Sequence, residues 1–298
     1  MNITHCTLFF IFYFVLLSVF TTFARMKQAM IFAAGLGTRL KPLTDTMPKA
    51  LVRVGGEPLL KHVVLRLKDA GYTRIIVNVH HFAGQIRDYL REQDNFGIDI
   101  RISDETEQLL ETGGGIKKAI PLFADDSPIL IHNVDVLDNV DYGWFSRQHL
   151  DNEDAVLLVS RRKTKRYLLF DNAMRLMGWI NVETGELKSP FDWIRSAEIT
   201  DVDWDNYKLT LSNRSNLSPL TSHPSPLMDN MFAFSGIHSF SPRLFPLMER
   251  FPDRFPIIDF YLSVCHRSHV MGLVKNDLRM IDVGKLDSLD KAEEFLNG

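Results

Sequence analysis

Short apolar runs alternate with segments whose apolar residues recur at helical spacing between residues 28 and 137. The runs predict buried strands, and the spaced segments predict helices that cover them. The predicted strands are 28–34, 74–80, 98–105 and 129–137, and the predicted helices are 58–70, 84–93 and 116–123. Because strands and helices alternate, we predict an α/β fold of three layers, α/β/α, with a mostly parallel central sheet.

Glycines and acidic residues stand where these predicted strands end. Gly35 and Gly37 follow the first strand, Asp104 and Glu105 end the third, and Asp135 lies at the end of the fourth. Ligands of open parallel sheets bind at the carboxyl ends of the strands. We therefore expect these residues to lie along one edge of the sheet.

The composition limits the class of protein. The 298 residues are long enough for one large α/β domain or two smaller ones, and the apolar fraction of 45% is ordinary for a globular protein. The net charge of −3 gives no general attraction for nucleic acid, so we expect no nucleic-acid partner and only a local anion site. Two cysteines without a CxxC pair support neither a disulfide framework nor a zinc site.

The first 25 residues differ from the rest, because residues 8–20, LFFIFYFVLLSVF, are almost wholly apolar. Three interpretations remain open: translation that starts at Met26, a membrane anchor or uncleaved signal, and a cleaved signal. The predicted first strand follows Met26 without a linker, which favours a start at Met26. We therefore treat residues 1–25 as an apolar extension and residues 26–298 as one domain.

The second half of the chain alternates less regularly. Residues 174–187 predict a hairpin, and 257–267 and 287–296 predict helices. Residues 189–226 are polar and rich in turn-forming residues, so we expect a loop insertion there.

The loop after the first predicted strand has the composition of a phosphate site. Glycines allow backbone N–H groups to approach phosphate oxygens, while Arg39 and Lys49 add positive charge. The loop has neither the GK[ST] of the Walker motif nor the third glycine of the dinucleotide motif. The glycine spacing alone fits a surface turn with solvated basic residues equally well.

The longer string 33-AAGLGTRLKPLTDTMPKALVRVGGEPLL-60 is more specific. It resembles the GxGTRLxPLTxxxPKxLxxVxGxPLL motif of the sugar-nucleotidyltransferases, also called nucleotide-sugar pyrophosphorylases. The resemblance continues through 110-LETGGGI-116 and Asp135 to 281-IDVG-284, and so covers 26–298 apart from the expected insertion. It is greatest to single-domain enzymes of the N-acetylmuramate 1-phosphate uridylyltransferase and mannose-1-phosphate guanylyltransferase type. It implies the Rossmann-like fold of nucleotide-diphospho-sugar transferases.

The resemblance also implies roles for individual residues. The nucleotide-binding residues would be Ala34, Gly35, Gly37, Thr38, Arg39, Lys49, Gly113 and Gly114. Arg39, Lys49 and Asp135 would be catalytic, and Asp135 and Asp282 would bind Mg²⁺. Val134 replaces the family's usual glycine before Asp135, and each aspartate also fits a strand-end cap or turn.

Further residues are implied near the base and the sugar. Gly113 and Gly114 would approach the base or ribose, although a flexible turn explains them too. Glu105 stands near the position of a base-reading glutamine, which leaves the base open. Gly236, Glu111 and Asp259 would contact the sugar, with a strand glycine and a helix cap as the alternatives for the first and last.

These expectations give a function. We expect a Mg²⁺-dependent enzyme that transfers a nucleotidyl group from an NTP, with UTP favoured, to N-acetylmuramic acid 1-phosphate or a related hexose 1-phosphate. The NDP-sugar product would be a cell wall precursor. The alternatives are a mannose-, glucose- or choline-phosphate nucleotidyltransferase, a regulator that binds nucleotide sugars without catalysis, and a membrane-anchored glycosyltransferase. The last rests on the apolar run at residues 8–20 and would need a DxD-type metal motif; 201-DVD-203 has that form but lies in the expected insertion, so we discount it. We expect a cytoplasmic monomer or small homo-oligomer, with membrane contact only through residues 8–20.

Overall fold

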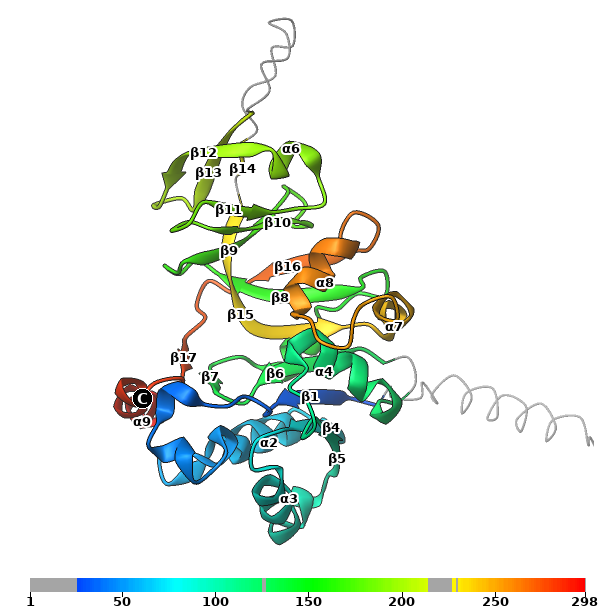
Figure 1. Ribbon diagram of the computed structural model, residues 1–298, viewed down its shortest axis with the longest axis vertical. Helices are drawn as coiled ribbons and strands as arrows, with labels where there is room; N and C mark the ends of the chain where they lie inside the picture. Colours follow the sequence, from blue (N-terminus) through cyan, green and yellow to red (C-terminus); the bar gives the residue numbers. More distant parts are fainter. Residues whose placement is uncertain (1–25, 125–126, 214–226, 229, 298) are drawn as a thin grey trace, which may run out of the picture.

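The computed structural model describes residues 26–124, 127–213, 227–228 and 230–297 (Figure 1). The expectations for residues 1–25 therefore lie outside the described residues. Among the helices that the structure describes, none has the length and apolar character needed to cross a membrane.

Four parallel strands form the first half of the central sheet (Figure 1). They are β1 (Gln28–Phe32), β4 (Arg74–Val79), β5 (Asp99–Asp104) and β6 (Ile129–Asn133). Their order is β6-β1-β4-β5, with Gln28 opposite both Arg74 and Ile129. Most residues of β1, β4 and β6 are buried, which explains why these strands are short apolar runs.

Helices cover both faces of this parallel region. On β1, Ala29 and Ile31 pack into one core, while Met30 packs into the other, as the two-residue period of a strand requires. The first core includes residues of α2 (Leu59–Asp69), α3 (Ala83–Glu92) and α9 (Leu289–Asn297). The second core includes residues of α4 (Glu111–Ala119), α7 (Phe245–Met248) and α8 (Ile257–Val264). The prediction of an α/β fold with helices on both faces is confirmed.

The second half of the sheet is mainly antiparallel. Its strands are β8 (Ala155–Ser160), β9 (Arg166–Phe170), β10 (Leu176–Asn181), β11 (Glu186–Lys188), β15 (Asn230–Phe240) and β16 (Val270–Val274). The long β15 pairs with β6, β8 and β9, and only β16 with β8 is parallel in this half of the described sheet. The pairing of β15 with β8 is irregular between Phe234 and His238, where Gly236 has φ 84°. A bulge at this glycine therefore shapes the wall between the two halves of the sheet.

Most of the described part of 189–226 is a folded unit and not the loop that we expected. It contains α6 (Asp192–Arg195), β12 (Ala197–Asp203) and β13 (Lys208–Asn213), and β13 pairs with β14 (Leu227–Met228). Ile194, Leu209 and Leu211 are buried in a third core with residues of β9, β10 and β15. The prediction was wrong for 192–213 because the polar composition concealed a few well-placed apolar residues. Residues 214–226 lie outside the described part.

Short elements complete the edge where the strands end. β2 (Arg53–Val54) pairs with β3 (Glu57–Pro58), and β7 (Val136–Asp138) pairs with β17 (Met280–Asp282). α5 (Tyr142–Ser146) follows β7. The pair of β7 and β17 joins the end of β6 to a segment almost 150 residues later in the chain.

A buried polar network anchors β7. Both carboxylate oxygens of Asp138 accept hydrogen bonds: Oδ1 from Arg66 Nη2 at 2.9 Å and Oδ2 from Tyr142 Oη at 2.9 Å. His132 Nε2 lies 2.9 Å from the same Oδ2. The side chain of Asp138 is fully buried, and its partners hold its pKa far below the ordinary value even though burial alone would raise it. The network thus needs a charged aspartate.

We predict that Asp138→Asn destabilises the protein by about 3 kcal/mol at pH 7, because a buried ion pair loses one partner. The folded-state pKa of Asp138 is depressed, so its stabilising effect is present above the unfolded pKa of about 3.9 and is lost as pH falls below it. Urea unfolding at pH 7 and pH 3 should therefore show a smaller difference between variant and parent at pH 3.

Asp88→Asn is the control, because Asp88 forms an exposed ion pair with Arg91. It should change the free energy of unfolding by no more than about 0.5 kcal/mol. Equal stability of Asp138→Asn and the parent at pH 7 would contradict the anchoring role.

Candidate active site

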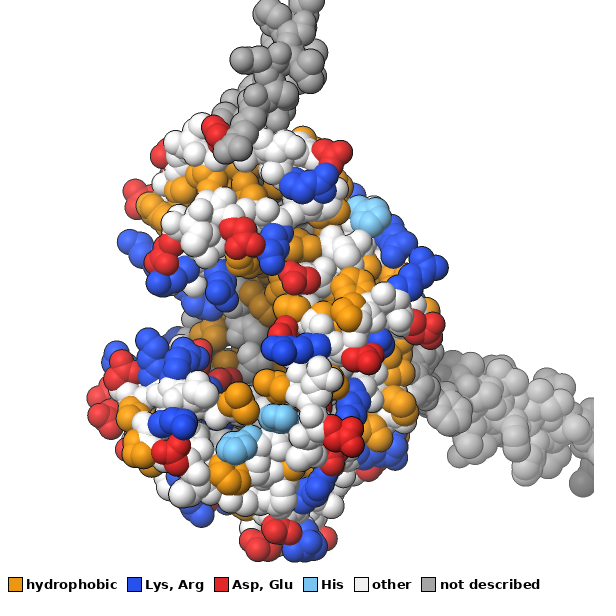
Figure 2. Space-filling view, in the orientation of Figure 1, with side chains coloured by type: hydrophobic (Ala, Val, Ile, Leu, Met, Phe, Trp, Pro, Cys, Tyr) orange, Lys and Arg blue, Asp and Glu red, His pale blue; other side chains and the backbone are white. Residues whose placement is uncertain are grey.

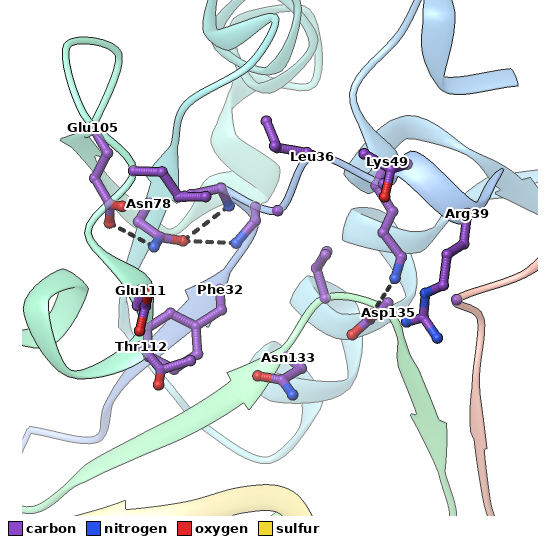
Figure 3. A pocket seen from close by; sticks show the side chains of 18 of the residues that line it. Phe32, Leu36, Arg39, Lys49, Asn78, Glu105, Glu111, Thr112, Asn133 and Asp135 are labelled. Atoms are coloured by element: carbon purple, nitrogen blue, oxygen red, sulfur yellow. Dashed lines mark hydrogen bonds and ion pairs between the residues drawn. The ribbon is translucent and has the colours of Figure 1, made fainter. Parts of the chain in front are cut away.

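A cavity of about 560 Å³ opens at the carboxyl ends of β1, β4, β5 and β6 (Figure 3). Its lining comes from the glycine loop, the ends of the parallel strands and the start of α4. Many of the residues singled out from the sequence line this cavity: Ala34, Gly35, Gly37, Thr38, Arg39, Lys49, Glu105, Glu111 and Asp135. The expectation that the glycine loop and the acidic strand ends lie along one edge is confirmed for Gly35, Gly37, Glu105 and Asp135. Asp104 does not line this cavity and forms an exposed ion pair with Arg87.

Asn78 holds the start of the glycine loop in place. Its Oδ1 accepts hydrogen bonds from the backbone N–H groups of Ala33 at 2.7 Å and Ala34 at 3.3 Å (Figure 3). Its amide group donates to Glu105 Oε1 at 2.7 Å, and Glu105 Oε2 accepts from the N–H of Leu110 at 3.1 Å. Glu105 is fully buried, and burial raises the pKa of its carboxyl group. Sequence reasoning missed Asn78, although a polar residue within an apolar strand is a usable signal.

The two glycines of the loop have different surroundings. Gly37 has φ 64°, and an added Cβ would lie 2.8 Å from Cγ2 of Thr44. Thr44 also donates its hydroxyl hydrogen bond to the carbonyl of Gly37 at 2.8 Å, so this turn requires glycine. An added Cβ at Gly35 would meet nothing within 4 Å. The backbone of Gly35 therefore faces open space, where a ligand can approach it closely.

Lys49 and Asp135, which carry opposite charges, lie next to each other in the lining of this cavity. Lys49 forms an ion pair with Asp135 Oδ2, and the side chains are only 9% and 22% exposed (Figure 3). Arg39 also lines the cavity, and it is exposed without a hydrogen bond or ion pair among the described residues. Lys49 is therefore held close to Asp135, while Arg39 is available to a ligand.

Asp282 lies beside Asp135 although the two are far apart in the sequence. Val136 is the pairing partner of Asp282, and the N–H of Val283 donates to the carbonyl of Asp135 at 2.8 Å. Burial raises the pKa of Asp282, and the negative charge of Asp135 raises it further, against the opposing effects of Lys49, Arg39 and Arg162. Two neighbouring carboxylates of this kind favour a bound cation.

The two carboxylates of Asp135 and Asp282 suit Mg²⁺, which needs few protein ligands, better than a metal whose ligands all come from protein side chains. Among the described residues no group of three or more His, Cys, Asp or Glu side chains could hold a metal. Mg²⁺ commonly takes one or two carboxylates and completes its shell with water and phosphate oxygens. Asp135 and Asp282 meet that requirement.

Gly113 and Gly114 do not line the cavity, which corrects their predicted place at the base. Their N–H groups donate to the carbonyl of Phe255 at 2.9 and 3.2 Å. An added Cβ would lie 2.3 Å from the Phe255 ring at Gly113 and 2.0 Å from the carbonyl oxygen of Asp253 at Gly114. Both glycines therefore allow α4 to pack against the segment before α8.

A second cavity of about 430 Å³ continues from the first. The two share Phe32, Thr112, Asn133 and Asp135. The second cavity also contains Arg162, Gly236, His238 and Asp282. An added Cβ at Gly236 would lie 2.7 Å from Nδ2 of Asn133, so glycine is needed where β15 passes the end of β6.

The other predicted sugar residues lie elsewhere in the same hollow. Glu111 lines the first cavity and not the second, with φ 63° and an ion pair to Arg254 at 3.0 Å. Asp259 lines a third cavity of about 480 Å³, where it pairs with Lys188 at 3.3 Å. The third cavity shares Arg162, Phe234 and Ile258 with the second. Figure 2 shows the hollow between the two parts of the molecule, with basic side chains on its rims.

The 201-DVD-203 motif lies outside these three cavities. It is part of β12, and Asp203 accepts hydrogen bonds from the N–H groups of Asp205 and Asn206 in the following turn. The aspartates that meet in the hollow are Asp135 and Asp282 instead.

Residues 28–167 match the family model described as nucleotidyl transferase. The chain is 48% identical over 111 residues to N-acetylmuramate alpha-1-phosphate uridylyltransferase of Caulobacter vibrioides, covering 37% of this chain and 46% of that protein. It is 45% identical over 115 residues to the enzyme of the same name from Neisseria meningitidis serogroup B, covering 39% and 49%. The chain thus spans about half the length of these relatives.

The fold is also similar to solved structures. The inositol-1-phosphate CTP transferase from T. maritima aligns with a TM-score of 0.64 at 15% identity, covering 91% of this chain and 95% of that one. This similarity supports the Rossmann-like fold over both halves of the sheet.

We predict that Gly114→Ala destabilises the protein by about 2 kcal/mol, because its Cβ would overlap a backbone carbonyl. Gly35→Ala is the control and should unfold within about 0.5 kcal/mol of the parent, since its Cβ meets open space. Thermal and urea unfolding measure both. A Gly114→Ala protein of parental stability would contradict the packing role and favour the original ligand-binding prediction.

Proposed function

We propose that this chain, whose residues 28–167 match the family model described as nucleotidyl transferase, transfers a nucleotidyl group from an NTP to a sugar 1-phosphate. The observation that supports this most is one hollow in which a glycine loop, two cations and two carboxylates converge. The residues are Gly35, Arg39, Lys49, Asp135 and Asp282. Transfer between phosphates needs charge neutralisation and in-line positioning more than a covalent intermediate.

In the proposed reaction a phosphate oxygen of the sugar 1-phosphate attacks the α-phosphorus of the NTP. A new P–O bond forms as the bond from the α-phosphorus to the bridging oxygen breaks. Pyrophosphate leaves with that bonding electron pair, and the products are an NDP-sugar and pyrophosphate. The first cavity would hold the NTP and the second the sugar 1-phosphate, with Asp135 where the two cavities meet.

Lys49 and Arg39 would bind the triphosphate. The open backbone at Gly35 allows phosphate oxygens to approach N–H groups, and Arg39 offers a guanidinium without a partner among the described residues. A triphosphate would compete with Asp135 for the ammonium group of Lys49. These contacts would stabilise the negative charge that develops on the leaving pyrophosphate.

Asp135 and Asp282 would hold Mg²⁺. When bound, the metal would neutralise phosphate charge, which these acidic side chains alone would repel. The raised pKa of Asp282 beside Asp135 supports this assignment, because a cation would relieve the repulsion between the two carboxylates.

UTP and N-acetylmuramic acid 1-phosphate are the substrates that we favour, because the relatives from Caulobacter and Neisseria have that activity in their names. A second candidate is GTP with mannose 1-phosphate. The chain is 34% identical over 145 residues to a mannose-1-phosphate guanyltransferase of Gibberella zeae, which supports it. The product would be a precursor for the cell wall in the first case.

The proposed function is tested by mixing each of four NTPs with a panel of sugar 1-phosphates and Mg²⁺ and measuring pyrophosphate release. We expect one pair to give a rate well above the others and EDTA to abolish it. If no pair releases pyrophosphate while the nucleotide sugars still bind, the protein is a binder and the proposal is wrong.

We predict that Asp135→Asn lowers kcat by about 100-fold or more, because a charged group at the reacting phosphates is lost. Asp104→Asn is the matched control, since Asp104 also ends a strand but lies outside the first two cavities. Its kcat should stay within about twofold of the parent. Parental turnover in Asp135→Asn would remove this residue from the catalytic set.

A further inference from the structure

The second cavity has an unusual balance of charge. Its charged lining residues are Asp135, Asp282 and Arg162. His238 is also part of the lining, but burial lowers its pKa to about 3, so it is neutral at pH 7. A phosphate that enters this cavity would meet two carboxylates and a single guanidinium among the described lining residues.

Arg162 is only partly satisfied by the protein. Its Nη2 donates to the carbonyl of Phe234 at 2.9 Å, whereas its buried Nε has no hydrogen-bond partner in the described structure. No carboxylate of the described residues lies within 4.0 Å of it, unlike Arg66, which pairs with Asp138. Burial also lowers the pKa of Arg162. A half-buried arginine in this state gains stability from an anion.

The backbone holds Arg162 against the cavity wall. Phe234, which accepts its hydrogen bond, borders the β15 bulge that contains Gly236. Arg162 lies two residues after the end of β8, at the junction of the second and third cavities. Its side chain thus borders both cavities while one of its N–H groups is held by the backbone.

Neighbouring polar atoms also lack partners. Both ring nitrogens of His238 and the hydroxyl of Tyr261 are buried without hydrogen bonds among the described residues. The two rings touch edge to face, with centroids 5.6 Å apart. Of these two residues, only His238 lines the second cavity together with Arg162. Buried polar atoms normally have partners, so Arg162 and His238 indicate that a polar ligand completes the cavity.

We propose that Arg162 binds the attacking phosphate of the sugar 1-phosphate and directs its oxygen toward the NTP. This inference rests on the proposed function. The cations that line the first cavity are Lys49, which is already paired with Asp135, and Arg39, which we assign to the triphosphate. Arg162 thus balances the second phosphate against the two aspartates.

The test compares Arg162→Gln with the parent, using the NTP and sugar 1-phosphate that give the highest rate. We expect the KM for the sugar 1-phosphate to rise about 10- to 100-fold, with the KM for the NTP within about twofold. Arg162→Lys should restore part of the affinity, because it keeps the charge without the planar fork.

Arg161→Gln is the matched control. Arg161 is the adjacent residue, is exposed and lies over the ring of Phe232 at 5.5 Å, outside the three cavities. Both KM values of this variant should stay near those of the parent. Unchanged values in Arg162→Gln would overturn the proposal. So would an equal rise in both KM values together with a lowered Tm, since that result describes a structural role.

Direct binding separates this inference from the proposed function. Calorimetric titration with N-acetylmuramic acid 1-phosphate should show binding to the parent and a loss of at least about 10-fold in Arg162→Gln. If the parent binds this compound through Arg162 but releases no pyrophosphate with any pair, only the proposed reaction fails. If the parent is active and both proteins bind the compound equally, only the role of Arg162 fails.

Discussion

The candidate site depends on holding two carboxylates beside each other. Burial raises the pKa of Asp282, and repulsion from the negative charge of Asp135 raises it further. Two features keep them in place: the pairing of β7 with β17 and the ion pair of Lys49 with Asp135. The buried network around Asp138 fixes the other end of β7. The repulsion between Asp135 and Asp282 makes this site costly in free energy to assemble. Backbone pairing of β7 with β17 and the buried hydrogen-bond network of Asp138 offset that cost.

The fold explains how residues from both ends of the chain reach this point. The parallel strands β1, β4, β5 and β6 bring their following loops to one edge, which forms the first cavity. The antiparallel extension then places β15 across the end of β6, and the glycine bulge at 236 opens the second cavity. Asn133 and Asp135 belong to both cavities. Two ligands bound there would meet where β6 ends, which is the arrangement that transfer between two phosphates requires.

The sequence was informative where local pattern and packing agree. Strands of the parallel region are buried on both faces, so their apolar runs predicted them well. The glycine loop lies at the ends of these strands, as the order of strands and helices indicated, and it lines a cavity with Arg39 and Lys49. Gly113 and Gly114 show the limit of this reasoning, because the sequence does not distinguish a glycine needed for packing from one needed for ligand binding. The hairpin of β12 and β13 was missed since only a few buried apolar residues define it. Nothing in the basic segment around Arg162 distinguishes this residue from its neighbours, because its burial depends on strands that are far away in the sequence.

The two halves of the hollow differ in how their polar groups are satisfied, and this difference bears on specificity. On the first side, Asn78 and Glu105 already satisfy one another and the loop backbone, so the shape of this wall is fixed before any ligand arrives. On the second side, Arg162 and His238 line the cavity and retain buried atoms without partners among the described residues. A ligand that supplies those partners gains affinity, whereas one that lacks them leaves buried polar atoms unpaired. Discrimination between sugar phosphates should therefore come from the wall formed by β15, α8 and the segment after β8. The fixed first wall should serve the part of the reaction common to all of them.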